Sequence, residues 1–137
     1  MRFIDANVFL RFITRDDPVK ASTCLELFQR LRQGREEATT SEAVIAEIVY
    51  VLVSTRQPYR LARAEVRARL MPLLRLRGLR LQDRGALLRA LEVFELYDDL
   101  DFEDVLTVAH MEASGIPELL SYDTGFDVIP GLRRIEP

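Results

Sequence analysis

The feature that most constrains the fold of this chain is the alternation of short strand-like segments with pairs of amphipathic helical segments. The expected strands cover residues 2–5, 38–40, 79–82, 118–123 and 131–137. The expected helices run over residues 7–14, 18–33, 41–54, 58–70, 84–96 and 102–114. Strands separated by helices favour an α/β fold: a three-layer α/β/α sandwich with a mostly parallel central sheet. Ligands of such sheets bind beyond the carboxyl ends of the strands.

Length and composition indicate one globular domain spanning residues 1–137. A chain of 137 residues with 48% hydrophobic and 30% charged residues can bury a core without covalent cross-links. Cys24 is the only cysteine, so no intramolecular disulfide forms, and a reducing cytoplasmic location is expected. The sequence contains neither a signal-peptide pattern nor an apolar run of about 18 residues, which argues against a membrane span.

The charge balance alone does not indicate a nucleic-acid-binding protein. The net charge is −3, whereas such proteins are usually basic. All but one of the 19 cationic side chains are arginine, and Lys20 is the exception. A guanidinium group binds two phosphate oxygens at once, but it binds carboxylates equally well, and genome composition also explains an excess of arginine.

Acidic residues stand at strand ends and on apolar helix faces, where a solvated charge is not expected. Asp5 ends the first strand, and Asp123 ends the strand 118–123, with Asp127 four residues later. Glu47 is in line with apolar residues of its helix, and Asp104 shares a helix side with Val108 and Met111.

Each of these acids also has a purely structural interpretation. Asp5 could favour the positive end of the following helix dipole, and Glu47 could form a structural ion pair. Asp104 could take part in helix capping with Asp101, and Asp123 could stabilise a turn.

The acids considered together indicate a metal site more strongly than any one of them alone. Carboxylates cannot gather in one cleft without a counter-charge, and a divalent cation is the simplest one. A site made only of oxygen ligands favours Mg²⁺ or Mn²⁺ over zinc. A zinc cluster is excluded because the chain has one cysteine and one histidine, His110. The sequence has neither phosphate-binding glycine motif, G-x-x-x-x-G-K-[ST] or G-x-G-x-x-G.

Four segments, in this order, resemble the PIN-domain family and, within it, the VapC-type toxins of type II toxin–antitoxin systems. They are FIDANVFLRFI (3–13), SEAVIAEIVYVL (41–52), DFEDVLTVAH (101–110) and SYDTGFDVIPGL (121–132). The resemblance covers essentially the whole chain. It implies a PIN-like fold, Mg²⁺- or Mn²⁺-dependent cleavage of RNA, homodimerisation, and inhibition by a small cognate antitoxin that packs a segment into an apolar groove near the site.

The resemblance also implies roles for individual residues. The catalytic and metal-binding positions fall on Asp5, Glu47, Asp104 and Asp123, with Asp127 as an accessory metal ligand. Asn7 and Ser121 would orient ligands or water, Ser121 standing where the family usually has threonine. The spacing of Arg60, Arg63 and Arg67 places them on one face of the helix expected over 58–70, which is either solvated or in contact with RNA or antitoxin.

Two other functions are also compatible with the sequence. A catalytically inactive PIN-like interaction module would keep the fold but bind metal weakly or not at all. An aspartate-based phosphotransfer domain also uses an acid after its first strand. Phosphatases of that kind need a second aspartate where this chain has Asn7, and phospho-receivers need a late lysine, whereas the only lysine is Lys20.

Overall fold

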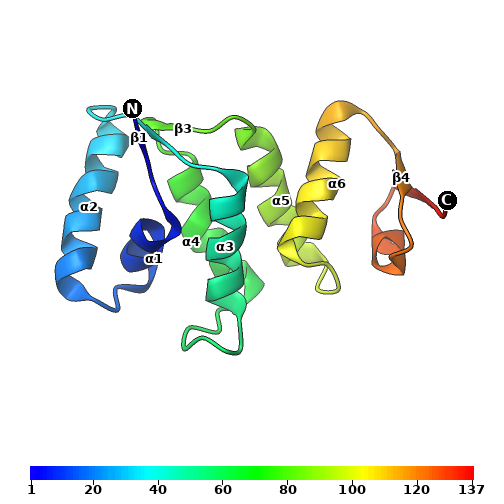
Figure 1. The fold of residues 1–137 in the computed structure, drawn as a ribbon, viewed down its shortest axis with the longest axis horizontal. Coiled ribbons are helices and arrows are strands. Elements are labelled where there is room, and N and C mark those ends of the chain that lie inside the picture. The colour runs from blue at the N-terminus through cyan, green and yellow to red at the C-terminus, as the bar shows by residue number, and fades with distance from the viewer. The chain divides into compact units, whose positions relative to one another are not determined.

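The computed structural model describes residues 1–137, which divide into two compact units, Met1–Arg84 and Gly85–Pro137 (Figure 1). The elements follow one another in the predicted order, with one short 3-10 helix added near the C-terminus. Every strand pair is parallel, so the predicted α/β class with parallel strands is confirmed. The single domain spanning 1–137 remains a prediction. No helix is both long enough and apolar enough to span a membrane.

The first unit contains a three-stranded parallel sheet in the order β1-β2-β3. Its strands are β1 (Arg2–Phe3), β2 (Ala38–Thr39) and β3 (Leu79–Arg80). Its helices are α1 (Ala6–Thr14), α2 (Pro18–Gln33), α3 (Glu42–Val53) and α4 (Arg63–Leu74). The strands are shorter than predicted, but the backbone pairing continues past β1, where the Ile4 amide donates to the Thr39 carbonyl at 2.8 Å.

Local sequence signals fix the ends of α2 and α3 as predicted. Pro18 occupies the first turn of α2, and the Asp17 side chain accepts a hydrogen bond from the Lys20 amide. Gly34 ends the same helix with φ of 70°, a conformation that glycine adopts without strain. Ser41 caps α3 by accepting a hydrogen bond from the Val44 amide.

The helix predicted over 58–70 is displaced in the structure. It begins at Arg63, because Arg60 has φ of 47° and the Leu61 amide donates to the Leu52 carbonyl at the end of α3. Pro72 does not end the helix, which runs to Leu74. A proline in the last turn removes only one intrahelical hydrogen bond, so the helix continues for two residues beyond it.

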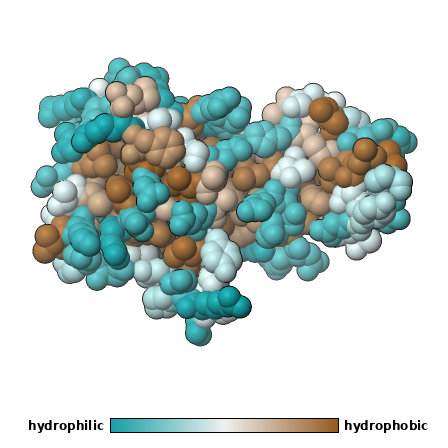
Figure 2. Space-filling model, viewed as in Figure 1, coloured by the Kyte–Doolittle hydropathy of each residue, from teal (hydrophilic) through white to brown (hydrophobic).

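Aromatic and aliphatic side chains form the core of the first unit and hold α1 against its neighbours. The Phe28 ring of α2 lies 5.4 Å from that of Phe9 and 4.8 Å from that of Phe12, centroid to centroid. Ile45, Ile48 and Leu52 of α3 are fully buried. Figure 2 shows hydrophilic side chains around the edge of this unit, with apolar ones visible between them. This packing fixes the start of α1, where Asp5 lies.

The second unit contains two helices and a two-stranded parallel sheet. Its helices are α5 (Arg84–Leu96), which begins at the boundary, and α6 (Phe102–Ser114), both as predicted. They are followed by β4 (Glu118–Leu120), the 3-10 helix η1 (Thr124–Val128) and β5 (Arg133–Ile135). Strand β4 pairs with β5 with Glu118 opposite Arg133, and the connection between them carries Asp123 and Asp127.

Candidate functional site

Asp5 lies directly after β1, at the N-cap position of α1, with an exposed side chain. Its backbone is extended, and its carboxylate makes no capping hydrogen bond. The preceding residue is held firmly, since the buried Thr40 hydroxyl donates to the Ile4 carbonyl at 2.8 Å. The Asp5 carboxylate therefore sits on a fixed backbone without a hydrogen bond to the helix end, and it can bind a ligand.

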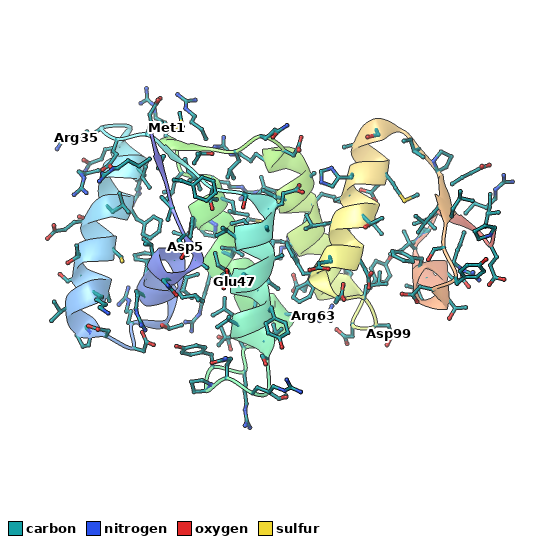
Figure 3. All side chains as sticks on the ribbon, in the orientation of Figure 1. Met1, Asp5, Arg35, Glu47, Arg63 and Asp99 are labelled. Atoms are coloured by element: carbon teal, nitrogen blue, oxygen red, sulfur yellow. The ribbon has the colours of Figure 1, made fainter.

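Glu47 lies on the exposed face of α3, opposite the buried side chains of Ile48 and Leu52. The apolar residues in line with Glu47 indicate either burial against a partner or a position on a cleft, and the exposure of Glu47 contradicts burial. The structural ion pair is also wrong, because the carboxylate has no ion pair or hydrogen bond in the structure. Asp5 and Glu47 belong to neighbouring elements, since α1 packs against α3 (Figure 3).

Asp104 lies in the first turn of α6 and forms a reciprocal capping box with Asp101. The Asp104 amide donates to Asp101 Oδ1 at 2.9 Å, and the Asp101 amide donates to Asp104 Oδ2 at 3.3 Å. Capping, the structural alternative, is therefore present. Burial raises the pKa of Asp104, and the negative charges of Asp101 and Asp123 raise it further. The second unit thus gathers three carboxylates that repel one another.

Asp123 follows β4 in a turn that its own side chain and Ser121 stabilise. The Asp123 amide donates to Ser121 Oγ at 3.0 Å, and Asp123 Oδ1 accepts from the Gly125 amide at 2.8 Å. The turn chemistry expected for this segment is present, and it leaves the other carboxylate oxygen of Asp123 available. Ser121 shapes the backbone that presents Asp123.

Asp127 differs from Asp123 because an arginine neutralises it. Arg134 of β5 donates to both Asp127 oxygens, at 2.8 and 3.3 Å. This guanidinium lowers the pKa of Asp127, so the carboxylate stays ionised within an ion pair. The sequence alone did not distinguish the two acids; the parallel pairing of β4 with β5 brings Arg134 to this turn.

The predicted arginine stripe is wrong in one of its three members. Arg63 and Arg67 lie on α4, but Arg60 precedes the helix in a left-handed conformation and does not share their face. The i, i+3, i+7 spacing assumed a continuous helix from Pro58, which the structure does not contain.

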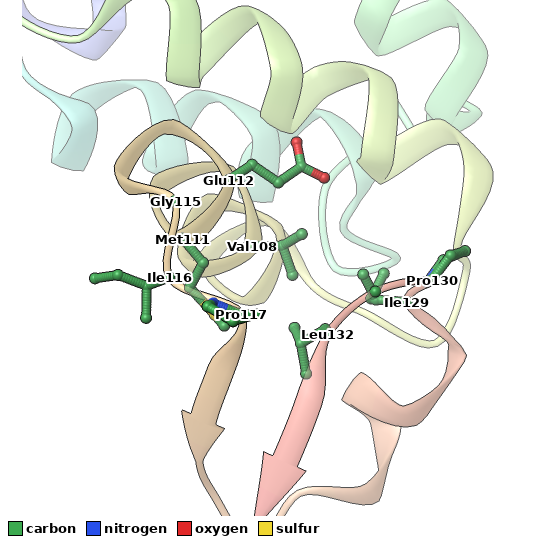
Figure 4. Close-up of a pocket in the computed structure, with 10 residues that line it drawn as sticks. Val108, Met111, Glu112, Gly115, Ile116, Pro117, Ile129, Pro130 and Leu132 are labelled. Carbon is green, nitrogen blue, oxygen red and sulfur yellow. The ribbon is translucent and has the colours of Figure 1, made fainter.

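A cavity of about 310 Å³ in the second unit lies between α6 and the segments that precede β4 and β5 (Figure 4). Its walls are mainly apolar, and Val108 and Leu132 point toward one another across it. Glu112 is its only charged residue, and its carboxylate is bound by Arg89 at 2.8 Å. None of the predicted site residues lines this cavity, so it supplies no catalytic groups.

Sequence reasoning named Asn7 as a site residue but missed two cationic residues close to it in the first unit, Arg11 and Lys20. Asn7 is exposed in the first turn of α1 and lines a second cavity together with Arg11 and Lys20. The four-residue spacing of Asn7 and Arg11 is the signal that could have predicted a shared helix face.

The chain belongs to the PIN-domain family, because the family model for the PIN domain matches residues 2–132. Among individual proteins, it is 30% identical to VapC ribonuclease Mb1869c of Mycobacterium bovis, over 98% of this chain and 99% of the relative. It is equally similar to Ribonuclease VapC13 of Mycobacterium tuberculosis, with the same coverage. The family resemblance predicted from the four sequence segments is therefore confirmed.

Proposed function

We propose that this chain is a metal-dependent endoribonuclease of the VapC type, the toxin of a toxin–antitoxin pair. The observation that carries the proposal is the end-to-end similarity to two proteins named as VapC ribonucleases. The family's acidic positions are all occupied, by Asp5, Glu47, Asp104 and Asp123.

The chemistry of these residues fits a hard divalent cation. Burial and repulsion between like charges make the ionised form of Asp104 unfavourable, and a bound cation would relieve both effects. Asp5 and Glu47 offer carboxylates that are not engaged with other side chains. All donors are oxygen atoms, which favours Mg²⁺ or Mn²⁺. Asp127 acts at most as an accessory, because Arg134 already neutralises it.

We assign Asp5, Glu47, Asp104 and Asp123 to metal binding and catalysis. When bound, the metal supplies a Lewis acid that activates water and neutralises charge on the phosphoryl oxygens. Asp101 holds the Asp104 carboxylate through its backbone amide, and Ser121 holds the turn of Asp123. Asn7, two residues after Asp5, offers an amide that orients substrate or water. Asp5 and Glu47 are exposed, which gives a polymeric substrate access to them.

A groove of about 770 Å³ between α2 and α4 suits the segment of an antitoxin. Apolar side chains form much of it, and its only charged residues are arginines. The apolar residues are Phe12, Leu25, Phe28, Pro72, Leu73 and Leu76, and the arginines are Arg32, Arg69, Arg75 and Arg77. An amphipathic segment with an acidic face would match both features.

Charge reversal in the groove tests this assignment. The double variant Arg75→Glu/Arg77→Glu should lose inhibition by the cognate antitoxin and still cleave RNA. Arg15→Glu/Arg56→Glu, at two exposed positions that do not line the groove, makes the same change of net charge and should remain inhibited. Equal inhibition of the two double variants would refute the assignment to this groove.

A homodimer is also part of the proposal. The chain has a mass of 15.8 kDa, so light scattering coupled to size exclusion should give about twice that value. A mass equal to one chain at micromolar concentration would contradict it.

The main experiment measures RNA cleavage by the purified chain with Mg²⁺, with Mn²⁺ and with EDTA. Cleavage should require the metal and should be lost in Asp5→Asn, whose folding is checked by circular dichroism. Glu26→Gln, an exposed acid on α2, is the matched control and should cleave normally. Cleavage that persists in EDTA would refute the metal mechanism, and the absence of cleavage under all conditions would refute the nuclease assignment.

A further inference from the structure

A cavity of about 370 Å³ lies between α1 and α2. Polar donors and apolar groups line it, and no acidic side chain does. The lining residues are Asn7, Val8 and Arg11 of α1 and Val19, Lys20, Thr23 and Cys24 of α2. A cavity of this volume is within the range of small-ligand sites.

The two cationic groups of this cavity, on Arg11 and Lys20, differ in whether a neighbouring carboxylate holds them. Asp16 holds Arg11, since Arg11 Nη1 donates to Asp16 Oδ2 at 2.8 Å, and the Tyr59 hydroxyl donates to the same oxygen at 2.8 Å. The Lys20 ammonium lies 3.9 Å from Asp17, which is too far for a hydrogen bond, and its side chain is 64% exposed. The guanidinium is therefore fixed in position, and the ammonium group is available to a ligand.

One wall of the cavity begins in the first turn of α1, the helix that Asp5 precedes. Asn7 is two residues after Asp5, and Arg11 follows Asn7 by one helical turn, so the amide and the guanidinium lie along one face of α1. The Cα atoms of residues two apart lie at most about 7 Å from each other, so a nucleotide next to one bound at Asp5 is within reach of Asn7.

We propose that the cavity between α1 and α2 is a subsite for the nucleotide next to the scissile phosphodiester, a proposal that rests on the ribonuclease function. Arg11, Lys20 and Asn7 supply donors for the phosphate oxygens, and Val8 and Val19 supply an apolar surface for the ribose or base. The subsite would explain how an acidic protein holds RNA: a few placed donors beside the carboxylates replace a generally basic surface.

The sequence permits a direct test, because Lys20 and Cys24 are the only lysine and the only cysteine. Amine acetylation therefore reports on Lys20, and maleimide labelling reports on Cys24, each read by mass spectrometry. The probe is a single-stranded RNA oligonucleotide, added to the full-length Asp104→Asn variant so that it is not cleaved. The N-terminal amine serves as the internal reference. RNA should slow acetylation of Lys20 at least about threefold relative to that reference, and it should slow maleimide labelling of Cys24 at least about threefold relative to the same sample without RNA.

Variants separate a binding role from a structural one. In the otherwise wild-type enzyme, Lys20→Gln should raise KM for RNA about three- to tenfold with little change in kcat. A plot of the logarithm of the binding constant against the logarithm of the salt concentration should become less steep by about 0.7, the value for one lost phosphate contact to a single strand. Lys20→Arg, which keeps the positive charge, should restore both the wild-type KM and the wild-type salt dependence. Arg35→Gln removes the same charge beyond the other end of α2, about 20 Å away along the helix, and should behave as wild type.

The outcomes distinguish this proposal from the one on which it rests. If the wild-type chain cleaves RNA but RNA protects neither Lys20 nor Cys24, the subsite is refuted and the nuclease function stands. If Lys20→Gln and Arg35→Gln raise KM equally, only general charge is involved, and the subsite is again refuted. If the wild-type chain does not cleave RNA, the nuclease function fails, and the labelling experiment alone decides whether the cavity binds RNA.

Discussion

Replacing Asp104 with asparagine separates the electrostatic role of this residue from its structural one. Asparagine has nearly the same shape, and its Oδ1 can still accept the hydrogen bond from the Asp101 amide. The substitution removes a charge that burial and two neighbouring carboxylates make unfavourable. We therefore expect metal-free Asp104→Asn to be at least as stable as the wild type at pH 7.

The sign of the pH dependence follows from the direction of the pKa shift. The pKa of Asp104 is higher in the folded than in the unfolded chain, so the folded chain binds more protons between the two values. Wild-type stability should therefore fall as pH rises from about 4, the unfolded value, through the folded value. In Asp104→Asn this contribution is absent, so its stability should vary less over that range.

Added metal should reverse the order of the two proteins. A ligand at a hundred times its Kd stabilises the form that binds it by about 2.7 kcal/mol. For a chain of 137 residues, 1 kcal/mol corresponds to about 3–5 °C in Tm, so the wild type should gain about 8–13 °C. Asp104→Asn, which lacks one of the proposed ligands, should gain only a small part of this shift.

Thermal melts followed by circular dichroism at pH 7, in EDTA and across a Mn²⁺ titration, measure both effects. RNA cleavage by Asp104→Asn should fall at least about 100-fold in the same buffers. If metal-free Asp104→Asn melts several degrees below the wild type, the electrostatic argument is wrong. If both proteins gain the same Tm with Mn²⁺, Asp104 is not a metal ligand. If the Tm of the wild type does not rise with Mn²⁺, the result would favour the catalytically inactive interaction module.

Three further predictions concern other parts of the molecule. The Tyr59 hydrogen bond and Arg11 lower the pKa of Asp16 to about 2, so Tyr59→Phe should have a lower urea midpoint than the wild type near pH 6. That difference should vanish as pH falls toward 2, and a difference that is constant with pH would contradict this. Gly78→Ala should lose about 3 kcal/mol in urea unfolding, because a Cβ there would overlap the Glu36 carbonyl oxygen; a wild-type midpoint would refute this. Asp127→Asn should retain RNA cleavage within about tenfold, since an arginine already neutralises this acid, and a loss as large as that of Asp104→Asn would make it a primary ligand.

The order of elements was predictable because each helix carries local signals at its ends. Asp17 with Pro18 begins α2, Gly34 ends it and Ser41 begins α3, in agreement with the helices predicted over 18–33 and 41–54. The start of α4 was not predictable, because it depends on a tertiary hydrogen bond from the loop after α3 to the Leu52 carbonyl. The sequence predicts Pro58 as part of the first helical turn, a position that proline favours. In the structure it belongs to the loop, and the helix begins five residues later, at Arg63.

The candidate site was predictable only in part, because sequence position does not specify how a carboxylate is engaged. Asp5 and Asp123 were predicted to end the strands over 2–5 and 118–123, and in the structure each follows a shorter strand by two or three residues. That an arginine binds Asp127 and not Asp123 depends on the pairing of β4 with β5. The exposure of Glu47 was likewise missed, because an apolar stripe predicts a packed helix face only when a neighbouring element covers it.

The proposed acids also differ in how much of each carboxylate the fold itself uses. Asp5 and Glu47 make no capping hydrogen bond or ion pair, so their side chains have no evident structural role. Asp104 and Asp123 each accept a backbone amide through one oxygen, so replacing them with alanine would remove a hydrogen bond as well as a charge. Replacement with asparagine removes the charge alone. A loss of activity in Asp104→Asn or Asp123→Asn with unchanged folding is therefore evidence about metal binding, whereas the same loss in an alanine variant is not. For Asp5 and Glu47 either replacement is informative.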